Sequence, residues 1–89
     1  KKIITKITTK NDGAWVVDIV GCGHKSKLRP KTKDHIRRFN TQEISGGKSS
    51  MVGGTLAVPT AGEVTLHWAQ PQRTINRIGH LVVEIAPYR

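Results

Sequence analysis

Short runs of β-branched residues, separated by turn residues, limit this chain to a fold built from strands. Residues 1–9 read KKIITKITT, and residues 14–20 read AWVVDIV. Isoleucine, valine and threonine favour strands because their branched side chains lose rotamer freedom in a helix and pack well on a pleated surface. The segment Asn11-Asp12-Gly13 between the two runs is typical of a tight turn. The pattern therefore predicts an N-terminal β-hairpin.

The C-terminal half alternates apolar and polar residues with the period of two that a half-buried strand requires. Its segments are TLAV (55–58), EVTLHWA (63–69) and HLVVEIA (80–86). The apolar residues that share a face are Val64, Leu66 and Trp68 in the second segment and Leu81, Val83 and Ile85 in the third. Helical periodicity is weak throughout, and the best helical candidate is Lys33 to Asn40. We predict an all-β fold, a small antiparallel β-sandwich or barrel of about six or seven strands with a basic loop.

The length of 89 residues suits one domain with one core layer and leaves no room for a deep active-site cleft. We expect a single domain over residues 1–89, which begins at Lys1 and is either a processed product or part of a longer chain. The glycine- and serine-rich segment SGGKSSMVGG (45–54) predicts a mobile loop. Cys22 is the only cysteine, which excludes an intramolecular disulfide and favours a buried thiol in a reducing compartment such as the cytoplasm.

Positive charge is concentrated in the N-terminal part of the sequence. The chain has 15 Lys and Arg against 6 Asp and Glu, a net charge of +9. Residues 1–38 contribute +8 of that charge, and the basic segment 24–38 alone holds seven Lys and Arg. A positive field of this kind concentrates polyanions near the protein and speeds their capture. Nucleic acid, an acidic protein and an anionic membrane surface would all respond to it.

The spacing within the basic segment would align its charges in an extended chain. The basic residues at every second position are Lys25, Lys27, Arg29, Lys31 and Lys33. Alternate side chains of a strand share a face, about 6–7 Å apart, and Pro30 disfavours a helical conformation for the residue before it. We predict that this row, extended by Arg37, Arg38 and Phe39, binds RNA or DNA phosphates with little sequence specificity. The alternative is a solvated loop that protects a sheet edge from aggregation.

The few aromatic residues limit how a nucleic acid could be bound. Single-strand readers stack several bases on exposed aromatic rings, whereas this chain has only Trp15, Phe39, Trp68 and Tyr88. We expect both tryptophans in the core, which leaves Phe39, directly after two arginines, as the candidate stacking residue. Phosphate contacts should therefore dominate.

Residues that could perform chemistry are sparse. Cys22 and His24 are close in sequence, but no second pair has the spacing of a zinc site, so we expect no metal and no cofactor. A small basic ribonuclease needs only an acid–base pair beside cations. His24 or His35, together with Glu43, would supply those residue types. We keep this ribonuclease or toxin activity as an alternative to a non-enzymatic binding module.

Residues 54–85, GTLAVPTAGEVTLHWAQPQRTINRIGHLVVEI, resemble the C-terminal half of a GOLD domain. The comparable positions are Gly62, Leu66, Trp68, Arg77 and Leu81 to Val83. The chain departs from the family at Ala69-Gln70, where GOLD domains usually have Asp-Asn. The resemblance implies a jelly-roll-like sandwich used for protein–protein contacts in membrane trafficking. It therefore supports a second hypothesis, a protein-interaction domain that binds an acidic protein or an anionic membrane.

Overall fold

The computed structural model describes residues 3–23, 28–42, 50–69 and 78–88 of the chain. These residues form seven strands and contain no helix, and hence no helix that could cross a membrane, which confirms the predicted all-β class. The strands are β1 (Ile3–Thr8), β2 (Ala14–Cys22), β3 (Arg29–Pro30), β4 (His35–Gln42), β5 (Ser50–Val58), β6 (Glu63–Ala69) and β7 (Gly79–Ile85).

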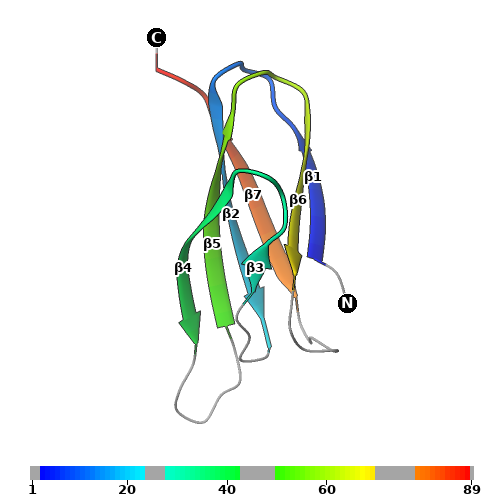
Figure 1. Ribbon diagram of the computed structural model, residues 1–89, viewed down its shortest axis with the longest axis vertical. Helices are drawn as coiled ribbons and strands as arrows, with labels where there is room; N and C mark the ends of the chain where they lie inside the picture. Colours follow the sequence, from blue (N-terminus) through cyan, green and yellow to red (C-terminus); the bar gives the residue numbers. More distant parts are fainter. Residues whose placement is uncertain (1–2, 24–27, 43–49, 70–77, 89) are drawn as a thin grey trace.

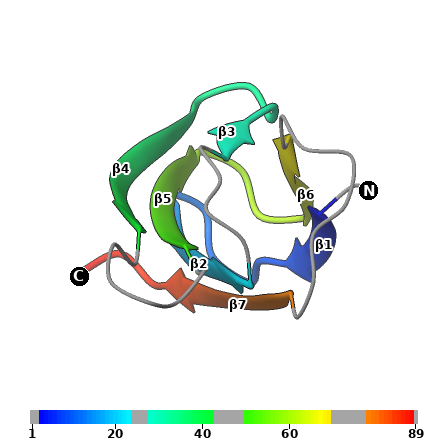
Figure 2. The same cartoon turned by 90° about the horizontal axis from the view of Figure 1, so that it is seen from below.

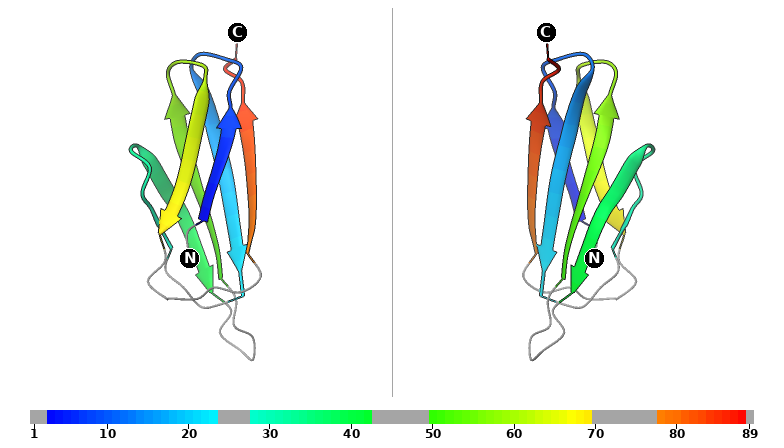
Figure 3. Two further views of the ribbon diagram at one scale, coloured as in Figure 1. Left: turned by 90° about the vertical axis from the view of Figure 1, so that its right-hand side faces the viewer. Right: turned by 90° about the vertical axis from the view of Figure 1, so that its left-hand side faces the viewer.

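The strands form two antiparallel sheets that face each other across the core (Figure 1). One sheet has the order β1-β6-β3, and the other has the order β4-β5-β2-β7. Seen along the strands, the sheets close around the interior, with β1 beside β7 at one seam and β3 beside β4 at the other (Figure 2). The side views show all the long strands running along the long axis of the molecule (Figure 3). The described residues therefore form the predicted antiparallel sandwich.

The predicted N-terminal hairpin is wrong, because β1 and β2 lie in different sheets. β1 pairs with β6, and β2 pairs with β5 and β7. The turn after β1 therefore carries the chain across the sandwich. The Glu84 carboxylate holds this turn by accepting hydrogen bonds of 3.0 Å from the backbone N–H groups of Lys10 and Asn11. These bonds, with one from the Asn11 side chain, lower the pKa of Glu84.

The helical candidate Lys33 to Asn40 is also wrong. Residues 35–42 form strand β4, after a turn in which Asp34 has a φ of 68°. Asp tolerates this left-handed conformation better than most residues do. The register of β4 against β5 shifts between Arg37 and Phe39, as in a β-bulge. The extra residue interrupts the alternation that marks a strand in a sequence.

The mobile loop predicted for residues 45–54 is wrong at residues 50–54, which belong to β5, while residues 45–49 lie outside the described part. Gly53 and Gly54 are in the strand because neighbouring side chains lie directly over their backbone. The ring of Phe39 covers Gly53, and the side chains of His35 and Asp18 cover Gly54. Glycine at these two positions therefore reflects close packing.

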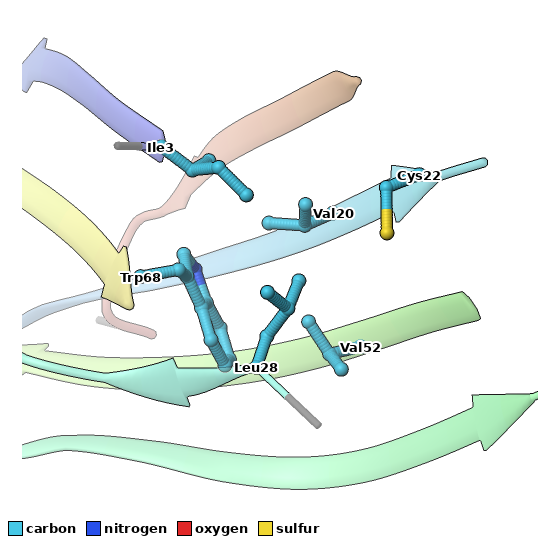
Figure 4. Close-up of a cluster of buried hydrophobic side chains, with 6 residues drawn as sticks. All are labelled: Ile3, Val20, Cys22, Leu28, Val52 and Trp68. Carbon is cyan, nitrogen blue, oxygen red and sulfur yellow. The ribbon is translucent and has the colours of Figure 1, made fainter. Parts of the chain in front are cut away.

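The core consists of two apolar clusters between the sheets. The first contains Ile3, Val20, Cys22, Leu28, Val52 and Trp68, whose side chains point toward one another in Figure 4. The second contains Val16, Leu56, Val58 and Leu66. Trp68 has no exposed surface, as predicted, and Cys22 is buried, but the prediction for Trp15 is wrong because that side chain lies on the outside of β2.

Candidate interaction surfaces

A buried carboxylate lies between the two apolar clusters. Asp18 is on the inward face of β2, between Val16 and Val20, and is almost completely inaccessible to solvent. His35 Nε2 donates to its Oδ1 at 2.8 Å, and His80 Nε2 donates to its Oδ2 at 2.8 Å. The indole N–H of Trp68 donates to the same Oδ2 at 2.7 Å. We call these four side chains the Asp18 cluster.

The cluster keeps Asp18 ionised. Burial alone would raise the pKa of the Asp18 carboxyl, but the hydrogen bonds from His35, His80 and Trp68 stabilise the charged form and bring the pKa well below its ordinary value of 3.8. His80 Nδ1 lies 2.6 Å from Thr5 Oγ1 on β1. In a neutral His80 the threonine hydroxyl is then the donor, because Nε2 already donates to Asp18.

The Asp18 cluster joins the sheets and has no exposed reactive group. Asp18, His35 and His80 come from β2, β4 and β7 of the four-stranded sheet, and Trp68 comes from β6 of the three-stranded sheet. The bond from Trp68 to Asp18 therefore links the two sheets, as does the contact between His80 and Thr5 on β1. The side chain of His35 is fully buried, packs edge-on against Trp68 and cannot contact an RNA phosphate in this structure. The other two ribonuclease candidates, His24 and Glu43, lie outside the described residues. Of these three candidates the structure therefore places only His35, and its side chain is out of reach of solvent.

Sequence reasoning missed Asp18 and His80. A signal for Asp18 was present, because it occupies an inward position of AWVVDIV with Val16 and Val20 two residues away on each side. A lone acid in an apolar stripe requires buried donors. Nothing in the sequence shows where those donors come from, because they are 17 to 62 residues away.

The outer face of the β1-β6-β3 sheet is polar and basic, and we call it the three-stranded face. Its side chains follow from the register: Ile4, Lys6 and Thr8 on β1, Glu63, Thr65 and His67 on β6, and Arg29 and Lys31 along the β3 edge. The backbone N–H of Lys31 donates to the backbone carbonyl of His67 at 2.7 Å, so Lys31 lies beside His67 on this face. The described residues of this face therefore include three cations and one carboxylate.

The predicted cationic row does not continue through the described residues. Arg29 and Lys31 are exposed on the three-stranded face, but Lys33 lies in the turn before β4. Lys25 and Lys27 lie outside the described part. Seven of the 15 Lys and Arg fall in that part, together with five of the six acidic residues. Most of the net charge of +9 therefore belongs to residues that are not described.

The remaining residues predicted to bind polyanions, Arg37, Arg38 and Phe39, lie on β4. Arg37 donates to the carbonyl of Leu28 at 2.8 Å, next to the seam between β3 and β4. Arg38 donates from Nε to Thr55 Oγ1 at 2.8 Å on the outside of the four-stranded sheet. Phe39 lies on that same outer surface against Gly53. Arg38 and Phe39 therefore do not join Arg29 and Lys31 on one face, whereas the Arg37 guanidinium reaches the backbone of the residue before Arg29.

The outer face of the β4-β5-β2-β7 sheet is strongly apolar, and we call it the docking face. Seven large apolar side chains on it are each 43% to 61% exposed: Trp15, Ile36, Phe39, Met51, Leu81, Val83 and Ile85. Leu81, Val83 and Ile85 share a face, as predicted, and it is this outer one. Among its described residues the docking face has one charged side chain, Arg38, and no carboxylate.

The described residues contain no group of three or more His, Cys, Asp and Glu side chains that could hold a metal ion. Comparison with known proteins gives no relative: no family model, no curated protein and no solved structure matches the chain. The resemblance to the GOLD domain stays a prediction.

Proposed function

We propose that this protein is a non-enzymatic binding module that engages a polyanion, specifically nucleic acid phosphates, through the three-stranded face. The observation that carries the proposal is the grouping of Lys6, Arg29 and Lys31 around His67 on an open sheet surface, whose described residues include a single carboxylate, Glu63. The opposite surface of the sandwich is apolar. Three of the seven described Lys and Arg side chains therefore share the three-stranded face, whereas one, Arg38, lies on the opposite face.

The arrangement of the cations suits an extended backbone of phosphates. Arg29 and Lys31 are two residues apart along one edge, a spacing of about 6–7 Å, and Lys6 lies two strands away, about 10 Å across the sheet. Phosphates bound across such a surface release condensed counterions, which favours binding at low salt. No Phe, Trp or Tyr side chain occurs among the described residues of this face. Base stacking is therefore a minor contribution, and we expect little preference among sequences.

The net charge of +9 also acts at long range. It steers polyanions toward the domain before any contact forms, and this effect depends on total charge more than on position. A useful test must therefore compare variants of equal net charge.

We expect Lys31→Glu to weaken binding to a single-stranded RNA several-fold and to reduce the salt dependence of the binding constant by about one unit of log–log slope. Lys10→Glu is the matched control, because Lys10 is exposed and follows β1 in the turn beside Glu84, away from the β3 edge. It changes the net charge equally and should leave the slope close to that of the wild type. Fluorescence anisotropy from about 50 to about 400 mM salt measures both quantities.

Equal slopes for the two variants would contradict the proposed site, because only long-range charge would then matter. No binding by the wild-type chain at low salt would contradict the function itself. The RNA should remain intact in every sample, and its cleavage would instead favour the ribonuclease alternative.

A second candidate function is protein interaction, and the docking face favours it. Seven half-exposed apolar side chains on one sheet surface exceed the scattered apolar residues that a monomer usually exposes. This surface has no cationic rim to attract an acidic partner or anionic membrane among its described residues, apart from Arg38. The shape and the near-neutral charge of the docking face therefore indicate which kind of partner it binds.

A further inference from the structure

We propose that the docking face packs against the docking face of a second copy of the chain, so that the protein forms a face-to-face homodimer. This inference rests on the second candidate function, protein interaction, and does not depend on polyanion binding. It follows from three properties of the face: its extent, its charge and its position relative to the basic surface.

The docking face approaches the size of one side of a standard protein–protein interface. Four strands about 4.8 Å apart and seven or more residues long cover a flat area of roughly 20 by 25 Å. Protruding side chains make the accessible surface area larger than this flat area. A standard interface takes about 800 Å² of accessible surface from each partner. Two sheet faces approach this value only when they cover each other completely. A second sheet of the same dimensions does so, whereas a single helix would cover only part of the face.

The apolar side chains are spread over the whole sheet. Ile36 and Phe39 come from the edge strand β4, Trp15 comes from the central strand β2, and Leu81 and Val83 come from the other edge strand β7. Such a continuous surface resembles one inner face of a β-sandwich. In a β-sandwich two sheets pack about 10 Å apart, and the strand directions of one sheet lie at about −30° to those of the other. A two-fold axis brings the same patch against itself.

Charge favours a second copy over a charged partner. The only described cation on the docking face is Arg38, whose guanidinium already donates to Thr55, and no carboxylate lies there. Among the described residues of this face a polyanion could pair only with Arg38, and no acidic or basic rim selects an oppositely charged protein. Two copies of a nearly neutral face meet without strong repulsion.

The basic surfaces of such a dimer point away from each other. Each three-stranded face is on the far side of its own sandwich, so three intersheet spacings of about 10 Å separate the two. This separation of about 30 Å is several Debye lengths at physiological salt. Repulsion between the two three-stranded faces is therefore screened, and both remain open to ligands.

Sedimentation equilibrium of the full chain, without nucleic acid, tests the proposal with two matched variants. Ile85→Glu introduces a charge beside Trp15 on the docking face, and Ile4→Glu makes the same change on the three-stranded face at nearly equal exposure, 47% against 51%. We expect the wild type and Ile4→Glu to be dimers at micromolar concentration and Ile85→Glu to weaken dimerisation at least tenfold. Circular dichroism verifies that each variant is folded, and Leu81→Lys replaces Ile85→Glu if the latter unfolds.

A wild type that stays monomeric to millimolar concentration would overturn the proposal, as would a folded Ile85→Glu or Leu81→Lys variant that dimerises like the wild type. If a monomeric wild type instead floats with neutral phosphatidylcholine vesicles and Ile85→Glu does not, the docking face binds a bilayer and the dimer is rejected while an interaction surface remains. A wild type that is monomeric and does not float with the vesicles would reject both the dimer and the bilayer-binding surface. RNA binding can persist in every case, so its loss and the loss of the dimer are separate results.

Discussion

Replacing Asp18 with alanine is expected to lower the free energy of unfolding by about 3–5 kcal/mol, the range for removing one partner of a buried charged group. The carboxylate accepts three hydrogen bonds, from His35, His80 and Trp68, and all three donors are at least nine-tenths buried. Without it these N–H groups are buried without a partner, which is more unfavourable than never having formed the bonds. A small domain has only about 5–15 kcal/mol of stability in total.

Urea unfolding followed by tryptophan fluorescence measures this loss. Asp12→Ala is the matched control, because Asp12 is exposed and accepts one hydrogen bond, from the backbone N–H of Ala61. It should lose no more than about 1 kcal/mol. Asp18→Asn should lie between the two, because its amide oxygen can still accept from Trp68 and His80. A loss below about 1 kcal/mol for Asp18→Ala would show that the cluster does not hold the sheets together.

The same carboxylate makes the wild-type protein sensitive to acid. The folded-state pKa of Asp18 lies well below the ordinary value of 3.8, so its contribution to stability is present above that value. As the pH falls below about 4, the unfolded chain takes up the proton first, and the contribution decreases toward the folded-state pKa. The folded fraction in intermediate urea should therefore fall between about pH 4 and pH 2, and this decrease should be smaller in Asp18→Asn.

Gly54→Ala is expected to be the second most damaging of these changes, with a loss of about 2–3 kcal/mol from overpacking. A Cβ at this position would lie 2.6 Å from His35 Nε2 and 3.1 Å from Asp18 Oδ1. Neither side chain can move away, since both are buried and hydrogen-bonded to each other. The added methyl group therefore has to break the Asp18 cluster or push β5 away from β2.

Gly53→Ala is the control for this prediction, because the three atoms nearest to its Cβ would all belong to the ring of Phe39. That ring is 43% exposed and can rotate toward solvent. We expect a loss below about 1 kcal/mol, partly offset because alanine restricts the unfolded chain more than glycine does. Thermal unfolding of the two variants side by side decides between close packing and loop flexibility. Equal stability of Gly53→Ala and Gly54→Ala would contradict the packing described for β5.

Local sequence patterns predicted most of the strands but not their partners. EVTLHWA alternates because β6 has one buried and one exposed side, and Trp68 is in the core as expected. The same rule misplaced Trp15, because β2 is apolar on both of its faces. Alternation shows that two faces differ, and it does not show which one is inside. That choice depends on strands distant in the chain.

The errors in β4, β5 and the basic segment have the same origin. Gly53 and Gly54 suggested a flexible loop, because composition cannot distinguish mobility from the close approach of Phe39 and His35. The alternating cations suggested one extended row, but the turn at Asp34 directs the chain from the three-stranded sheet to the four-stranded sheet. The apolar docking face was missed because its strands are neighbours only in the folded sheet.

The most direct test of the central claim, that the three-stranded face binds nucleic acid phosphates, is a titration of isotope-labelled protein with a short single-stranded RNA, followed by backbone amide shifts. We expect the shifts to concentrate at Lys6, Arg29, Lys31 and His67 and to decline at high salt. The docking-face residues Trp15, Val83 and Ile85 should not respond. Shifts confined to the docking face, or no shifts at low salt, would contradict it.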